Sequence, residues 1–175
     1  MSRNYKTYEG GLFFVTLTVV GWIDVFIRRE YCDCLVQNLK YCQEKKGLQL
    51  YAYCIMSSHV HLIAATENGL LSNILRDFKS YTAKQLLQLI SENPQESRKE
   101  WLLFLCRHFA KNTPNTEIQF WQQHNHPIDL TSNALIDQKV NYIHENPVKS
   151  GLVNEAQNYF YSSANPLSPI KVLAL

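Results

Sequence analysis

The chain has 175 residues, 46% of them hydrophobic and 12% aromatic, and a formal net charge of +2. This composition can fill the core of one folded domain and excludes a largely disordered chain, while the small net charge neither requires nor excludes nucleic acid as a partner. The glycine-rich motifs GxxxxGK[ST] and GxGxxG do not occur, which argues against a nucleotide cofactor.

The first segments of the chain predict a strand, a helix and two more strands. Residues 11–22 are rich in β-branched and aromatic side chains and predict a strand. Residues 28–47 carry apolar side chains at helical spacing and end in Lys-Lys-Gly, so they predict a helix. Two further strands are predicted at 48–56 and 59–65, and their short connection makes them antiparallel neighbours.

The rest of the chain is predicted to be mainly helical. Residues 70–94 predict a long helix that ends at a proline, and residues 95–112 predict another helix. Residues 118–130 begin like a strand, but a proline limits it to a sheet edge or a turn. Residues 132–147 predict a helix that starts with a serine N-cap and ends at its proline.

This order of elements predicts an α+β fold, in which helices pack on a central antiparallel sheet. We expect a single domain over residues 1–175, with a helical insert around 93–116 and a C-terminal tail from about residue 152. The first apolar run is too short for a membrane helix and no signal peptide precedes it. Five cysteines without a CxxC pattern fit reduced core thiols, so we expect a soluble, cytoplasmic protein.

Two histidines lie one residue apart in the strand predicted at 59–65. Because side chains alternate along a strand, His59 and His61 share one face, and Val60 and Leu62 lie on an apolar face that belongs against the helices. Two imidazoles spaced in this way can bind one divalent metal ion. The ordinary alternative is a pair that is only hydrogen-bonded, and a metal site needs further ligands.

The helix predicted at 132–147 offers a further ligand and a nucleophile. Its apolar stripe is formed by Ile136, Val140 and Ile143. Tyr142 and Asn146 lie one turn apart on an adjacent flank, so a phenol and an amide project together. The ordinary alternative is that Tyr142 packs in the protein and that Asn146 ends the helix.

Taken together, MSSHVHLI and the later YIHENPVKSGLV resemble the single-tyrosine HUH transposases, in the insertion-sequence branch related to REP-associated tyrosine transposases. HUH denotes two histidines around a hydrophobic residue, here His59, Val60 and His61. The resemblance spans roughly residues 11–163. One departure is Ser58, where the family usually has asparagine, and we expect it to alter the surroundings of the first histidine without loss of activity.

The resemblance implies a ferredoxin-like, RRM-like fold and a DNA-cleaving enzyme. His59, His61 and Asn146 would hold a divalent metal ion, Mg²⁺ or Mn²⁺, and Tyr142 would be the nucleophile. The implied reaction cleaves and rejoins single-stranded DNA that carries a hairpin, through a 5′-phosphotyrosine, in a monomer or a homodimer. The covalent link keeps the bond energy, so resealing needs no ATP.

Other side chains are candidates for DNA contact through charge or stacking. Lys139 is also a candidate to assist the tyrosine, because a phenol is mostly neutral at pH 7. The whole set is Arg76, Lys79, Tyr81, Lys84, Trp121, Lys139 and Lys149. For the basic residues the ordinary alternative is a solvated helix face, and for Trp121 it is a place in the core.

Two other functions fit the same motifs. A domesticated DNA-binding protein would recognise a sequence or a hairpin without strand transfer, and replacing Tyr142 would not affect it. A metal-dependent hydrolase or oxygenase of small molecules would need another histidine or a carboxylate near His59 and His61, and no predicted strand carries an obvious one.

Overall fold

The computed structural model describes residues 7–111 and 117–175. One antiparallel sheet has the order β2-β3-β1-β4 and consists of β1 (Phe13–Thr18), β2 (Leu48–Ile55), β3 (His59–Thr66) and β4 (Ile128–Asp129). The helices are α1 (Arg29–Lys46), α2 (Leu71–Glu92), α3 (Lys99–Ala110) and α4 (Asn133–Lys149), with short 3₁₀ turns η1 (Val20–Trp22) and η2 (Ala156–Asn158). The chain order β-α-β-β-α-α-β-α is ferredoxin-like with two additional helices, α3 and α4, which confirms the predicted α+β class.

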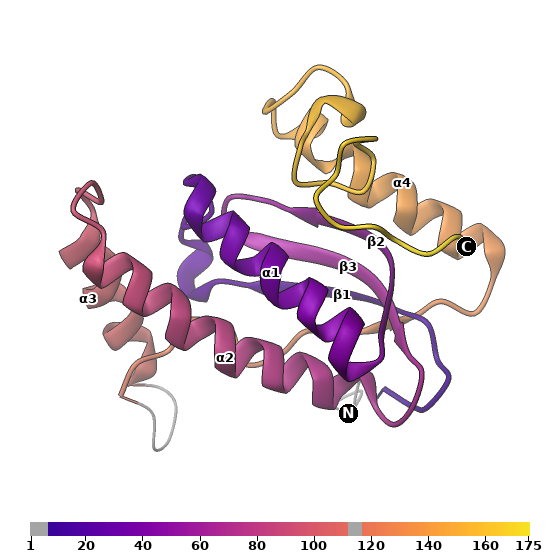
Figure 1. Ribbon diagram of the computed structural model, residues 1–175, viewed down its shortest axis with the longest axis horizontal. Coiled ribbons are helices and arrows are strands. Elements are labelled where there is room, and N and C mark those ends of the chain that lie inside the picture. The colour runs from indigo at the N-terminus through magenta and orange to yellow at the C-terminus, as the bar shows by residue number, and fades with distance from the viewer. Residues whose placement is uncertain (1–6, 112–116) are drawn as a thin grey trace.

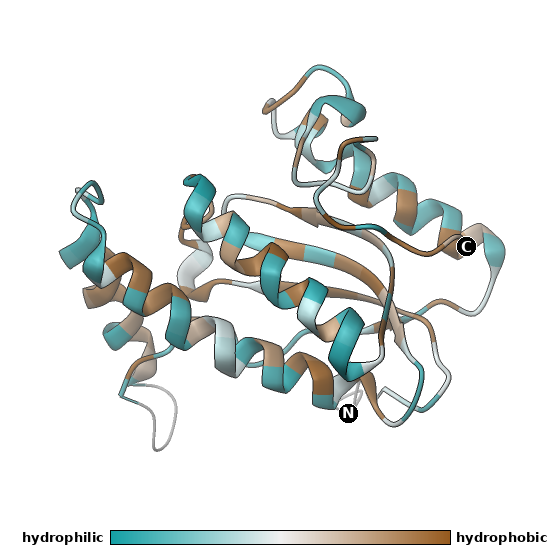
Figure 2. Ribbon diagram, in the orientation of Figure 1, coloured by the Kyte–Doolittle hydropathy of each residue, from teal (hydrophilic) through white to brown (hydrophobic). Residues whose placement is uncertain are grey.

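Helices cover both faces of the sheet (Figure 1). Because side chains alternate along β3, its two faces belong to two hydrophobic cores. Val60 and Leu62 pack in the core beneath α1 and α2, and Ile63 packs in a second, smaller core with Ile143 of α4. The central strands are mostly hydrophobic, whereas α1 presents hydrophilic residues to solvent (Figure 2). The predicted faces of β3 and the predicted apolar stripe of α4 are therefore confirmed.

Other parts of the same chain bond to the outer side of β2 and to the part of β1 that β4 does not reach. Along β2, the Ile55 N–H donates to the carbonyl of Tyr161 and the Ser163 N–H donates to the carbonyl of Tyr53, each at 2.9 Å. Along β1, the Thr16 N–H donates to the carbonyl of a residue that precedes β4, at 3.3 Å. These bonds occupy backbone groups that an open strand edge would offer to another chain.

Two predicted segments differ from the structure. The strand predicted at 118–130 is reduced to β4 and one isolated bridge between Trp121 and Val19. The prediction that the last helix ends at Pro147 is wrong, because α4 continues to Lys149. Pro147 cannot donate a hydrogen bond from its own nitrogen, and the helix continues for only two residues beyond it.

The remaining predictions on organisation have mixed outcomes. The predicted insert contains α3, and its last residues, 112–116, lie outside the described residues. All five cysteines are buried and none forms a disulfide, as predicted. Within residues 7–111 and 117–175, no helix is both long enough and apolar enough to span a lipid bilayer.

A buried carboxylate holds the turn between α2 and α3. Glu96 is 4% exposed and accepts hydrogen bonds from Arg28 at 2.8 Å, Arg98 at 3.1 Å and the Tyr31 hydroxyl at 3.3 Å. Burial opposes its charge, but the hydrogen bonds from Arg98 and Arg28 outweigh burial and lower the pKa of Glu96 to about 2. The carboxylate is thus the shared partner of two guanidinium groups.

We expect Glu96→Gln to lower the free energy of unfolding by about 3 kcal/mol, because it leaves two cations without their counter-charge. The ionised carboxylate stabilises the fold above its ordinary pKa of 4.5, and this stabilisation is lost as the pH falls towards 2. Urea unfolding at pH 7 and pH 3 should therefore show a larger acid-induced loss in the native protein than in Glu96→Gln. The exposed Glu100→Gln is the control, and equal pH dependence of the native protein and Glu96→Gln would contradict the prediction.

Candidate active site

The two histidines lie on the face of β3 that α4 covers, with ring centres 4.6 Å apart. His61 is buried and His59 is partly exposed. Thr16 faces His61 across the β1–β3 pair, and its Oγ1 lies 2.9 Å from Nδ1 of His61. Ser58 Oγ lies 3.1 Å from Nδ1 of His59. Hydroxyl groups thus engage both Nδ1 atoms, and Nε2 is the nitrogen of each ring that can bind a metal.

Burial keeps both imidazoles in the neutral form. Burial, together with charge repulsion from the neighbouring His59 and Lys139, lowers the pKa of His61 to about 3. Burial also lowers the pKa of His59, although the carboxylate of Asp24 opposes this. Neutral imidazole is the form that coordinates metal ions, so the electrostatics favour ligation at pH 7.

Helix α4 brings three of the predicted side chains to the histidine pair. The ring centre of Tyr142 lies 5.2 Å from that of His61, and the Asn146 amide nitrogen lies 3.4 Å from His61 Nε2. The oxygen and nitrogen of an asparagine amide exchange places on a half-turn, so Asn146 can present its oxygen there. The Lys139 ammonium lies 5.5 Å from the centre of the Tyr142 ring. The phenol therefore has a cation and an imidazole beside it.

The donor set fits a divalent ion that keeps open coordination positions. Two neutral imidazoles and one amide oxygen suit several divalent metals and leave positions for phosphate and water. Throughout the described part of the chain, no three His, Cys, Asp or Glu side chains lie close enough together to bind a metal ion. The small-molecule hydrolase alternative needs such a third ligand near His59 and His61, and the described residues do not supply it.

Two site residues on β1 were not identified from the sequence. The ring of Phe14 stacks on His61 at 5.4 Å and meets Tyr142 edge-on at 5.8 Å, while the Lys139 ammonium lies 4.8 Å from its centre. Phe14 and Thr16 share the face of the sheet that carries the histidines. The period-two pattern of FFVTLT gives their common face, but it does not show that this strand pairs with the histidine strand.

A comparison with protein families identifies the chain. The family model described as transposase, IS200-like, matches residues 24–123, which is more than half of the chain. The chain belongs to the IS200-like transposase family. The matched region of this transposase includes all of β3 and therefore both histidines.

Two relatives extend the comparison over most of the chain. A Haemophilus influenzae protein assigned to the REP-associated tyrosine transposases is 25% identical over 156 residues, covering 89% of this chain and 80% of the relative. The solved structure of a REP-associated tyrosine transposase bound to a REP hairpin superposes with a TM-score of 0.60 and 18% identity, covering 90% of this chain and 78% of the other. The first supports the predicted branch of the family, and the second shows the shared fold.

Two of the predicted DNA contacts have structural roles. Trp121 is 4% exposed and its Nε1 donates a hydrogen bond to Thr82 Oγ1 at 3.0 Å, so the prediction that it stacks on a base is wrong. The Lys79 ammonium donates to the carbonyl oxygens of Gln122 and Gln123, at 2.6 and 3.1 Å. Burial also lowers the pKa of Lys79 to about 8. This lysine holds the loop before β4 and does not offer a free charge to a phosphate.

The other α2 candidates lie away from the histidine pair. Tyr81 and Lys84 line a cavity of about 540 Å³ between α1 and α2, on the opposite side of the sheet. Arg76 is exposed and forms an ion pair with Asp77 at 2.9 Å. Any DNA contact of these residues is therefore separate from the histidine site. Lys149 is exposed in the last turn of α4, the helix that carries Tyr142.

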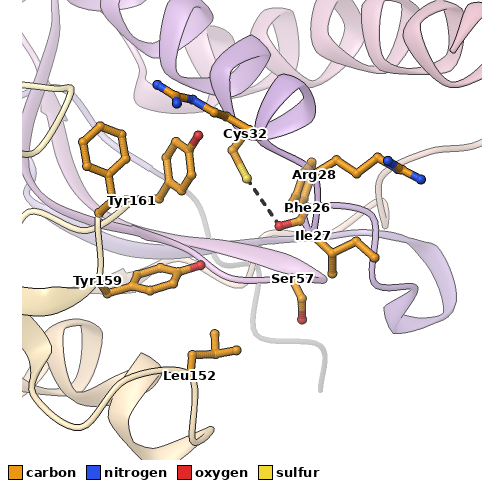
Figure 3. Close-up of a pocket in the computed structure, with 10 residues that line it drawn as sticks. Phe26, Ile27, Arg28, Cys32, Ser57, Leu152, Tyr159 and Tyr161 are labelled. Atoms are coloured by element: carbon orange, nitrogen blue, oxygen red, sulfur yellow. Dashed lines mark hydrogen bonds between the residues drawn. The ribbon is translucent and has the colours of Figure 1, made fainter. Parts of the chain in front are cut away.

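A second cavity, of about 510 Å³, lies beside the turn that leads into His59 (Figure 3). Its walls come from the start of α1, from Ser57 between β2 and β3, and from the tail at Leu152 and Tyr159. Neither histidine nor Tyr142 belongs to its lining. The cavity is therefore a neighbour of the histidine site and not part of it.

Proposed function

We propose that this IS200-like transposase cleaves and rejoins hairpin-bearing single-stranded DNA, with Tyr142 as the nucleophile. The observation that carries the proposal is that Tyr142 and Asn146, from the last helix, lie against His61 in the centre of the sheet. The structure of the relative bound to a REP hairpin supports a hairpin as part of the substrate. With 40% of its surface exposed, Tyr142 can be reached by a DNA strand.

The proposed step is an in-line displacement at phosphorus. The phenolic oxygen of Tyr142 forms a bond to phosphorus as the bond from phosphorus to the 3′ oxygen breaks. The 5′ phosphate is then attached to the tyrosine, and the other strand leaves with a 3′-OH that takes up a proton. The phenolic proton is released to water, and Lys139 stabilises the phenolate as it forms. Attack of a 3′-OH on the phosphotyrosine reverses the step and frees Tyr142.

The remaining site residues prepare this step. His59, His61 and Asn146 would hold a divalent ion such as Mg²⁺ or Mn²⁺, which when bound neutralises the non-bridging oxygens of the phosphate. Thr16 and Ser58 fix the orientation of the two rings through Nδ1. The serine found in place of the usual asparagine thus still provides a hydrogen bond to the first histidine.

Removing the hydroxyl group of Thr16 tests whether it orients the His61 ring for metal binding. Thr16→Val keeps the volume of the side chain but leaves Nδ1 of the buried His61 without its partner. We expect divalent metal affinity to fall roughly tenfold to a hundredfold. The measurement is the Mn²⁺ concentration that half-activates DNA cleavage. Thr66→Val, at the far end of β3, is the control, and unchanged Mn²⁺ dependence in Thr16→Val would contradict the prediction.

We further propose that one copy of the chain contains a complete site. Tyr142 and His61 meet within a single chain, and the tail of that chain bonds to the outer side of β2. A second subunit is therefore not needed to supply the tyrosine or to cover β2.

Labelled hairpin oligonucleotides from the DNA flanking the gene test the proposed function. With Mg²⁺ or Mn²⁺, a 3′-labelled oligonucleotide should transfer its label to the protein, because the 3′ fragment carries the 5′ phosphate. A 5′-labelled oligonucleotide should instead release a shorter strand with a 3′-OH, and EDTA should suppress both products. Absence of a covalent adduct across such hairpins would favour the domesticated DNA-binding alternative.

A further inference from the structure

Trp22 is an exposed tryptophan that the fold holds in a disfavoured backbone conformation next to His59. It ends η1, the short turn after β1. Gly21 and Trp22 both have left-handed backbone angles, with φ of +61° and +56°. Glycine adopts this conformation readily, whereas a bulky residue there is rare and requires that the surrounding structure enforces it.

The turn that carries Trp22 is supported on both sides. Val20 is buried, and its N–H donates to the carbonyl of Phe120 at 2.9 Å. The Phe109 ring of α3 covers Gly21 so closely that a Cβ at Gly21 would lie 2.5 Å from it. The indole of Trp22 is therefore projected outward from a fixed support.

The indole lies open at the edge of the histidine site. It is 59% exposed, although tryptophan is highly buried on average, and its ring centre lies 5.4 Å from that of His59 in an edge-to-face contact. Tyr41 on α1 is a similarly exposed aromatic residue, but it lies on the α1–α2 side of the sheet, away from the histidines. An open aromatic ring on rigid backbone, beside a candidate ligand site, suits stacking with a flat ring of the ligand.

We propose that Trp22 is a stacking platform for an unpaired DNA base next to the phosphodiester that Tyr142 attacks. The inference rests on the proposed function, in which that phosphodiester lies at His59 and His61. Every base has a flat face, so the stacking holds the strand in place without reading its sequence. Trp22 thereby contributes to substrate affinity and not to the bond that breaks.

Fluorescence identifies the ring that meets the DNA. The probe is a hairpin from the DNA flanking the gene, with unpaired oligothymidine arms, in EDTA so that no cleavage occurs. The chain has three tryptophans, of which Trp121 is buried and Trp101 is 52% exposed on α3. Stacking quenches indole emission, so quenching should persist in Trp101→Phe and be lost in Trp22→Phe. Equal quenching in Trp22→Phe and the native protein would overturn the proposal.

Affinity measurements locate the base. Trp22→Ala should bind the same probe roughly tenfold to a hundredfold more weakly, whereas Trp22→Phe should retain most of the affinity. Removing single bases from the arms, one position at a time, should reveal one sensitive position near the foot of the hairpin in the native protein. Trp22→Ala should bind the probe that lacks this base as tightly as it binds the complete probe. If removal of the base and removal of the indole lowered the affinity additively, the proposal would be overturned.

Trp22→Gly separates stacking from a structural role. Glycine adopts the left-handed backbone conformation without strain. The thermal midpoint of Trp22→Gly should therefore not fall below that of the native protein, even though quenching is lost. A large fall would make the indole a packing group and overturn the inference. Because binding is measured in EDTA, quenching without any adduct in the cleavage assay would overturn the proposed cleavage and leave Trp22 as a base-stacking residue of a DNA-binding protein. Adduct formation with unchanged binding in Trp22→Ala would overturn this inference alone.

Discussion

Tyr142→Phe is expected to abolish covalent attachment to DNA and to lower strand cleavage by roughly a thousandfold or more, as expected when a covalent nucleophile is removed. The substitution deletes one oxygen atom. It keeps the ring contacts with His61 and Phe14, so the fold and the DNA affinity should change little. A denaturing gel that resolves protein–DNA adducts gives the first effect, and anisotropy of a labelled hairpin gives the second.

Tyr41→Phe is the matched control for this experiment. Tyr41 is 54% exposed on α1, on the side of the sheet away from the histidines, and should be dispensable for the adduct. An adduct that persists in Tyr142→Phe would place the nucleophile elsewhere. Cleavage that persists without an adduct would point to direct attack by water, and the tyrosine would then only shape the site.

The site could be predicted from the sequence because its parts obey local periodicities. The two-residue period of β3 places His59 and His61 on one face, and the helical period of α4 places Tyr142 one turn from Asn146. That the two elements meet was implied by the family resemblance and not by the periodicities. Their contact depends on how α4 packs on the sheet, which is a property of the whole fold.

The parts that escaped prediction depend on contacts between distant segments. The helical pattern of α2 places Lys79 on the surface of the helix. In the structure the loop before β4 folds over it, and carbonyl groups of that loop accept its hydrogen bonds. Trp121 belongs to a segment with strand character, but that segment mostly forms a loop along β1, which places the ring in the core. Strand pairing likewise brings Phe14 and Thr16 to the histidines. A single sequence contains little information about such pairings.

The position of the C-terminal tail also could not be predicted from the sequence. The tail bonds to β2 through main-chain groups, as between Ser163 and Tyr53, and no pattern of side chains predicts such bonds. Side chains then secure the tail: the Tyr159 hydroxyl donates to the carbonyl of Ile55 at 2.8 Å, and His144 Nε2 lies 2.9 Å from Ser163 Oγ. His144, on the side of α4 away from Tyr142, therefore anchors the tail and takes no part in the proposed chemistry.

His61→Ala is expected to have the second large effect, a loss of metal-dependent cleavage of roughly a thousandfold, because it removes a proposed ligand at the centre of the site. His61 is 4% exposed and contacts Thr16, so stability should also fall, by about 1–3 kcal/mol.

Two measurements separate these effects. A bound metal stabilises the native state by about 2.7 kcal/mol at a hundred times its dissociation constant, so Mn²⁺ should raise the thermal midpoint of the native protein. The rise should vanish in His61→Ala and persist in His108→Ala, which replaces an exposed histidine on α3. Cleavage is compared well below both midpoints, so that loss of fold does not contribute. If His61→Ala retained both the Mn²⁺ rise and native cleavage, the imidazole would be no ligand and the chemistry would need another centre.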